Sequence, residues 1–241
     1  MTSPRLVTAT VSALAAVLLL AGCTTGPGAG AGQTTSDPSS GPGTSEEFDE
    51  MEGTILDEGR SFAVVTWGSS TCIPQVDEVS ADGQTVTVSL VDSDADEVCT
   101  ADMTQRASLG TLPEGVDPTQ DITLNVTYGE LRDDVDLAGD AAFTATPGSP
   151  TEYTPSAGWF DDSSLVLLTW GSSGCPPVVD SIEGSGNTGT VTFATDPERM
   201  CTMDMAPRGT ILAFDDDAID DEDFTLTLVG DSLDGTVQVR G

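Results

Sequence analysis

Thr66-Trp67-Gly68-Ser69-Ser70-Thr71-Cys72-Ile73-Pro74 recurs as Thr169-Trp170-Gly171-Ser172-Ser173-Gly174-Cys175-Pro176-Pro177, at an offset of 103 residues. A second block, Cys99-Thr100-Ala101-Asp102-Met103-Thr104-Gln105-Arg106, recurs as Cys201-Thr202-Met203-Asp204-Met205-Ala206-Pro207-Arg208. Self-similarity at a fixed spacing is typical of repeated structural units. The sequence therefore predicts two homologous modules over residues 54–140 and 157–241, joined by a linker over residues 141–156.

Each module is predicted to be all-β. Apolar residues alternate with polar ones in equivalent places of the two copies, a pattern typical of half-buried strands. These residues are Phe62, Val64, Val86, Val88, Leu90, Ile122, Leu124 and Val126, and then Leu165, Leu167, Val191, Phe193, Phe224, Leu226 and Leu228. Turn signals at Asp82-Gly83 and Gly186-Asn187 separate the strands. About six short strands in each copy favour two tandem small β-sandwich or barrel-like modules.

Five cysteines are present, and four of them belong to the repeats. Of the three connectivities open to these four, the one that repeats joins Cys72 to Cys99 and Cys175 to Cys201. Each bond would close a loop of about 28 residues, worth about 3.6 kcal/mol. A thiolate metal site or a redox pair is disfavoured, because the chain has neither a Cys-x-x-Cys motif nor a histidine.

The fifth cysteine, Cys23, ends a signal-like N-terminus. Arg5 precedes a charge-free apolar run from Leu6 to Ala21, too short for a spanning helix and suited to a signal peptide. Leu20-Ala21-Gly22-Cys23 resembles the bacterial lipobox, which implies cleavage before Cys23 and attachment of a diacylglycerol to its sulfur. Residues 1–22 are therefore expected to be a lipoprotein signal peptide, with an ordinary cleaved signal as the alternative.

A Gly/Ser/Thr/Pro-rich stretch follows, and residues 23–53 are expected to be a lipidated cysteine and a flexible tether. Thirty such residues span roughly 30 Å, enough to hold a module away from a membrane. Two acyl chains give durable anchoring. We expect an extracytoplasmic protein on the outer face of the cytoplasmic membrane, with an unknown envelope or extracellular partner.

Charge excludes several classes of function. The chain has 41 acidic residues, seven arginines, no lysine and no histidine, a formal charge of −34. Loss of Arg5 with the signal peptide would leave six arginines and a charge of −35. Phosphate backbones repel such a chain, so nucleic acid is not expected as a partner. Without histidine or lysine there is no His-dependent nucleophile, Schiff base or P-loop lysine.

The two sequence blocks that occur in both copies supply the candidate ligand contacts. The Trp-Gly-Ser-Ser block lacks a Gly-x-Ser-x-Gly frame, so we interpret it as a strand end, with a tryptophan near the disulfide and a turn. Asp102 and Arg106 are expected on one face of a strand, where an acid on a neighbouring strand would pair with the arginine; an anion or peptide carboxylate is the alternative. The candidate ligand contacts are Trp67, Ser69, Ser70, Asp102, Arg106, Trp170, Ser172, Ser173, Asp204 and Arg208.

No resident metal or cofactor is expected, although two sequence patterns resemble metal sites, one for calcium and one for copper(I). Asp92, Asp94 and Asp96 resemble the opening of a calcium loop, but Glu97 stands where an EF-hand needs glycine and Met103 where it needs a bidentate glutamate. Weakly bound calcium is kept as an alternative. Met200, Cys201, Met203 and Met205 form a run that would suit copper(I). Since the first copy keeps only Met103, core packing of Met103 and Met205 is favoured.

Taken together, the paired blocks over residues 55–241 resemble those of small exported lipoproteins of actinobacteria. The resemblance implies lipoprotein biology and transfers no catalytic residue. We expect a non-catalytic surface lipoprotein with a binding or envelope role. The alternatives are a calcium-dependent binding protein and a hydrolase that uses a pair of carboxylates.

Overall fold

The computed structural model describes residues 50–93 and 98–241. In this part of the chain each repeat forms seven strands, most of them with alternating apolar and polar residues. The first copy contributes β1 (Glu52–Leu56), β2 (Ser61–Gly68), β3 (Gln75–Asp82), β4 (Thr85–Val91), β5 (Thr104–Thr111), β6 (Ile122–Tyr128) and β7 (Leu131–Leu137). The second contributes β8 (Ser156–Trp159), β9 (Ser164–Gly171), β10 (Val179–Ser185), β11 (Thr188–Phe193), β12 (Ala206–Ala213), β13 (Thr225–Val229) and β14 (Gly235–Arg240). Two single-turn 3₁₀ helices, η1 (Asp57–Gly59) and η2 (Asp216–Ala218), complete these elements.

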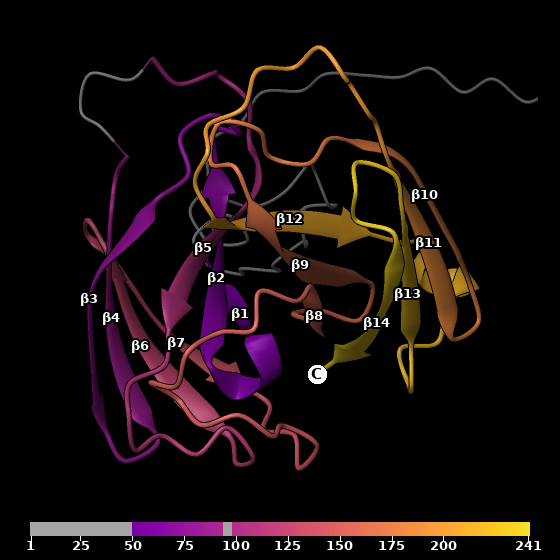
Figure 1. Ribbon diagram of the computed structural model, residues 1–241. Coiled ribbons are helices and arrows are strands. Elements are labelled where there is room, and N and C mark those ends of the chain that lie inside the picture. The colour runs from indigo at the N-terminus through magenta and orange to yellow at the C-terminus, as the bar shows by residue number, and fades with distance from the viewer. Residues whose placement is uncertain (1–49, 94–97) are drawn as a thin grey trace, which may run out of the picture. The chain divides into compact units, whose positions relative to one another are not determined.

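The two modules share one strand topology (Figure 1). In the first, the sheet β1-β2-β5 faces the sheet β3-β4-β6-β7, and only β4 and β6 run parallel. The second repeats these pairings, but β14 also pairs with β8, through Val239 with Ala157 and Arg240 with Gly158. Its seven strands therefore form one continuous sheet, in the order β10-β11-β13-β14-β8-β9-β12. The predicted all-β fold of two homologous modules is confirmed.

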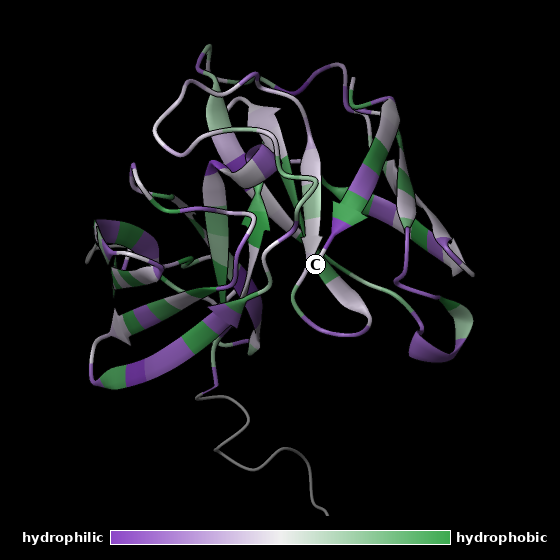
Figure 2. Cartoon of the chain, turned by 90° about the horizontal axis from the view of Figure 1, so that it is seen from below, coloured by the Kyte–Doolittle hydropathy of each residue, from purple (hydrophilic) through white to green (hydrophobic). Residues whose placement is uncertain are grey.

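Each module has its own core. Phe62 and Val64 of β2 pack on the apolar face of β4 and β6, and Leu165 and Leu167 of β9 do the same in the second module. The alternation that produces these faces is visible as bands of hydrophobic and hydrophilic residues along several strands (Figure 2). Gly83 and Gly186 have positive φ angles of 64° and 55°, which confirms the predicted turns between β3 and β4 and between β10 and β11.

A third apolar cluster joins the two modules. Ala63 and Val65 point to the opposite face of β2 from its core residues, and Val166 and Leu168 do so on β9. All four are at most 2% exposed, because the outer faces of the two sheets cover each other. An uninterrupted apolar run is what a strand buried on both faces requires.

Equivalent strands meet at this joint. β1 contacts β8 and β5 contacts β12, as expected for two modules related by an approximate two-fold axis. β5 and β12 run in different directions (Figure 1) and approach at Ala107 and Gly209, where a Cβ on the glycine would lie 3.3 Å from the alanine Cβ.

One sequence-based boundary and the number of strands change. β1 begins at Glu52 and Met51 is only 5% exposed, so the ordered fold starts inside the stretch assigned to the tether, residues 23–53. Each module has seven strands rather than about six; β1 and β8 bury consecutive residues and therefore show no alternation of apolar and polar side chains. The predicted signal peptide, Cys23, most of the tether, Asp94 and Asp96 lie outside the described residues.

Candidate functional site

The repeated blocks form a clasp at one end of each module. β2 ends at Gly68, directly after Trp67, and β9 ends at Gly171, directly after Trp170. The turn that follows is joined by a disulfide to the segment before β5 or β12. The bonds are Cys72–Cys99 and Cys175–Cys201, each with its Cα atoms 5.5 Å apart, as predicted.

The repeated arginines brace this turn from behind. Arg106, 7% exposed, donates from Nη1 to the carbonyl oxygen of Cys72 at 2.5 Å and from Nη2 to that of Trp67 at 3.0 Å. Arg208 donates in the same way to the carbonyl oxygens of Cys175, at 2.9 Å, and Trp170, at 3.0 Å. Within residues 50–93 and 98–241 neither guanidinium forms an ion pair with a carboxylate, although the charge of Asp231 acts on Arg208.

This bracing explains the glycine of the Trp-Gly pair. A Cβ on Gly68 would lie 2.5 Å from Cζ of Arg106, and one on Gly171 would lie 2.8 Å from Cζ of Arg208. Both distances are shorter than a nonbonded contact allows. The glycine therefore leaves room for the guanidinium.

The repeated aspartates hold the turn from its exposed side. Asp102 accepts a hydrogen bond from the backbone N–H of Ser70 at 3.3 Å and one from the Thr100 hydroxyl. Hydrogen bonding by the Thr100 side chain first and by the Ser70 side chain second, with a smaller contribution from the Ser70 N–H, lowers the pKa of Asp102 to about 2. Since β5 begins only at Thr104, the predicted strand face shared by Asp102 and Arg106 is wrong.

Asp204 has the same surroundings in the second module. It accepts hydrogen bonds from the N–H of Ser173 at 3.2 Å and from the Thr202 hydroxyl, and its pKa is also lowered to about 2, by the Thr202 bond first. Sequence reasoning missed the threonines as site residues. Their signal was the repetition of Cys-Thr at equivalent positions.

The remaining candidate contacts occupy the clasp surface. Ser69 Oγ lies 2.8 Å from Thr100 Oγ1, and Ser172 Oγ lies 2.7 Å from Thr202 Oγ1, so both half-buried serines belong to the clasp itself. Ser70 and Ser173 are exposed. Trp170 meets the ring of Tyr153 edge-on, with 5.2 Å between centroids.

The methionines correct another expectation. Met103 and Met205 are each 59% exposed, so the predicted core packing is wrong. Met200 and Met203 are 96% and 104% exposed. The residues lie in irregular segments before β5 and β12, which the disulfides hold outside both cores.

Two grooves lie between the modules, one on each side of the contact between β5 and β12. The first has a volume of about 530 Å³ and joins the clasp of the second module to apolar residues of the first. It is lined by Ile73, Pro74, Gln75, Val76, Ala107, Ser108, Leu109, Ser173, Pro176, Pro207, Arg208 and Gly209.

The second groove has a volume of about 430 Å³ and joins the clasp of the first module to residues of the second. It is lined by Ser70, Ile73, Thr104, Gln105, Arg106, Ala107, Pro176, Pro177, Gly209, Thr210, Ile211 and Ala213. The structure therefore places four predicted contacts at the grooves, one Ser–Arg pair in each.

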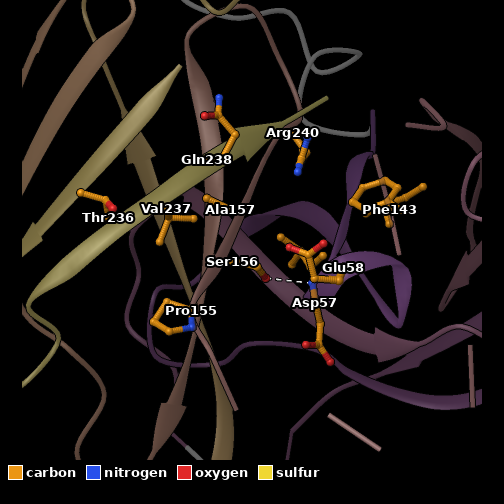
Figure 3. A pocket seen from close by; sticks show the side chains of 12 residues that line it. Asp57, Glu58, Phe143, Pro155, Ser156, Ala157, Thr236, Val237, Gln238 and Arg240 are labelled. Carbon is orange, nitrogen blue, oxygen red and sulfur yellow. Dashed lines mark hydrogen bonds between the residues drawn. The ribbon is translucent and has the colours of Figure 1, made fainter. Parts of the chain in front are cut away.

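A smaller cavity of about 150 Å³ lies elsewhere at the joint, beside η1 (Figure 3). Asp57 and Glu58 have positive φ angles of 52° and 55°, a strained conformation for residues other than glycine. The N–H of Asp57 donates to Ser156 Oγ at 2.8 Å, and its carboxylate lies 3.2 Å from Nη1 of Arg60. Burial raises the pKa of Asp57. The bond between Asp57 and Ser156 ties the first module to the start of the second.

The calcium candidates are only partly described. Asp92 accepts a hydrogen bond from the Tyr128 hydroxyl, while Asp94 and Asp96 lie outside the described residues. Among the residues that are described, no group of three or more His, Cys, Asp and Glu residues is arranged to hold a metal ion. Within those residues there is also no helix long and apolar enough to cross a membrane.

Comparison of the chain with protein-family models, with curated proteins and with solved structures finds no match.

Proposed function

We propose that the chain is a membrane-anchored extracytoplasmic lipoprotein that binds a partner through the two grooves and performs no catalysis. The observation that carries the binding role is the pair of grooves at the joint, each built from both modules. Grooves of this size that combine apolar surface with a few polar groups are typical of binding sites; the first groove is more apolar than polar, and the second has similar shares of both. Ile73 is 41% exposed, although it is a large apolar residue, and it lines both of them.

The anchor and location are supported by the sequence and by the disulfides. Cys23 follows the apolar run from Leu6 to Ala21 at the position where a lipid would be attached. Disulfides persist in oxidising, extracytoplasmic compartments, and both repeats contain one. The charge of −34 keeps the surface well solvated.

The anchor is tested by Cys23→Ala in the parent cell. Wild-type protein should sediment with membranes, and the mass of its N-terminal peptide should include a diacylglycerol on Cys23. The variant should lack this mass and should not be cut before residue 23. A wild-type N-terminal peptide without lipid would refute the anchor.

The binding role is tested by capture of envelope proteins on the full-length chain. Ile73→Asp places a charge in both grooves, so it should abolish capture of a partner that the wild type retains. Leu131→Asp is the matched control, because Leu131 is 37% exposed on β7 and lines neither groove. Equal capture by wild type and Ile73→Asp would contradict binding at the grooves.

A further inference from the structure

We propose that the second groove binds an extended peptide segment, which adds to the free edge of β12 as a further strand and carries one carboxylate among apolar residues. The inference rests on the proposed function, because it names the ligand of one of the two grooves. It adds a mode of binding and a chemical class for the ligand.

The edges of the sheets differ in charge. Among the strands of the described residues, β1, β3, β7 and β10 each end a sheet, and each contains at least one acidic residue. β5 and β12 also end their sheets, but neither contains an acidic residue, although the chain has 41 of them. Charged side chains protect an edge strand from pairing with another chain. The edges of β5 and β12 therefore lack a protection that the other edges have.

The second groove runs along the edge of β12. Successive side chains of a strand point to opposite faces, so successive residues line one groove only at the edge of the strand. β12 lines the second groove with Gly209, Thr210 and Ile211. Within the part of the chain that the structure describes, the backbone of residues 209–213 forms no hydrogen bond outside its ladder with β9. Such an edge presents unpaired N–H and C=O groups to which an extended peptide can add as a strand.

The edge of β12 is more open than that of β5. On β5, Ala107 and Ser108 are 9% and 1% exposed; β3 packs against this strand, and the Ser108 hydroxyl donates to the carbonyl oxygen of Pro74 at 2.6 Å. The equivalent residues of β12, Gly209 and Thr210, are only half-buried. Among the described residues, the Thr210 hydroxyl has no equivalent of the Ser108 bond. The second module thus leaves open an edge that the first module covers with its own chain.

The shape of the second groove also suits an added strand. Residues 209–213 contain no proline, so each of them has a backbone N–H, whereas Pro207, which lines the first groove, has none. Ile73, Pro176 and Ile211 supply apolar surface for side chains of the ligand. A volume of about 430 Å³ leaves room for a few of them.

The lining also determines the charge of the ligand. Arg106 is the one charged residue that lines the second groove in the described part of the chain. Its hydrogen bonds to carbonyl oxygens leave its positive charge in place, and this charge is 7% exposed without an ion pair among the described residues. A buried charge without a counterion favours an anionic partner. Because the charge of −34 on the whole chain opposes a strongly acidic ligand, we assign one carboxylate in an otherwise apolar segment.

Solution NMR on the full-length mature chain, held in a non-ionic detergent, tests the added strand. The probe is a seven-residue peptide, acetylated and amidated at its ends, in which valine and threonine surround one central glutamate. We expect one peptide to bind per chain and to slow hydrogen exchange at backbone N–H groups of residues 209–213. A peptide with glutamine in place of the glutamate should bind about fivefold more weakly, and one with arginine more weakly still.

Ala213→Glu and Thr111→Glu form a matched pair of variants. The two positions are equivalent in the repeat and both are exposed, but of the two only Ala213 lines the second groove. Ala213→Glu places a second carboxylate beside that of the peptide and should weaken binding about tenfold. Thr111→Glu should leave the affinity unchanged. Equal thermal midpoints of the wild type and both variants show that the variants are folded.

Several results would overturn the inference. They are no binding at millimolar peptide, slowed exchange on β3 or β5 instead of β12, equal affinity for the three peptides, and tighter binding of the arginine peptide. Any of these together with loss of partner capture in Ile73→Asp would overturn this inference alone and leave the proposed function standing. Undiminished capture by Ile73→Asp, which alters the second groove as well as the first, would overturn both proposals.

Discussion

At the scale of single residues, the repeat is a set of side chains that hold one turn in place. Arg106 braces the carbonyl oxygens behind the turn, Asp102 holds its exposed N–H, and Gly68 leaves room for the guanidinium. The sequence suggested a task for the arginines, because two of the six expected in the mature chain stand at equivalent positions of the repeat. It did not show that their partners are backbone groups, because the turn bends residues of distant sequence position into contact.

Arg106→Met tests the bracing role. It removes the guanidinium while keeping a long apolar side chain, so its hydrogen bonds to the carbonyl oxygens of Cys72 and Trp67 are lost. We expect the free energy of unfolding to fall by about 3 kcal/mol, since a buried group without a partner costs about 1–3 kcal/mol. Urea denaturation measures this. Arg132→Met, at an exposed position of β7, should change stability by less than about 0.5 kcal/mol.

Acid should weaken the aspartate contacts. Asp102 and Asp204 have folded-state pKa values of about 2, below the ordinary value of 3.8. Their contribution to stability is therefore complete above pH 3.8 and is lost as the pH falls toward 2. The difference in thermal midpoint between wild type and the Asp102→Asn/Asp204→Asn variant should be largest near neutral pH and shrink across this range. A constant difference would contradict the assigned contacts.

At the scale of elements, β2 and β9 connect the core of each module to the contact between the modules. Each carries apolar residues on both faces, one for its own core and one for the other module. Alternation in the sequence predicted the core-facing set. The residues that face the other module belong to the same apolar run. The sequence shows that they are apolar, but it does not show which surface of the protein covers them.

The disulfides belong to this scale, because each ties the turn after one strand to the segment before another. The free energy of unfolding of the Cys72→Ser/Cys99→Ser variant should be lower by about 3–4 kcal/mol, because the unfolded chain gains conformational entropy when the disulfide is removed. The Cys175→Ser/Cys201→Ser variant should lose nearly the same amount, since the separations are 27 and 26 residues. Non-reducing peptide mapping should find each pair within its module. A link between modules would refute the assignment.

At the scale of the whole molecule, the described residues behave as two modules with a common joint. The apolar cluster between β2 and β9 is reinforced by the hydrogen bond from Asp57 N–H to Ser156 Oγ. The Arg240–Asp140 ion pair, 3.2 Å long, adds a second polar link. Because the grooves lie at this joint, binding depends on the two modules remaining together.

Leu168→Ala tests the energetic coupling. Leu168 is 1% exposed and faces the first module, so its truncation should cost about 2–5 kcal/mol. Calorimetry should show one cooperative transition in the wild type and a broadened or divided transition in the variant. Leu131→Ala, at an exposed residue, is the control. Division of the wild-type transition itself would contradict a tightly coupled joint.

The sequence by itself determined the all-β class, the two copies, the turns at Gly83 and Gly186, and both disulfides. These features depend on alternation along a strand, on local turn geometry and on equivalence between repeats. Only the tertiary structure decided the partners of Arg106, the exposure of Met103 and Met205, and the two grooves. Each of these depends on which faces meet in space, where packing and hydrogen bonding between distant segments outweigh local pattern.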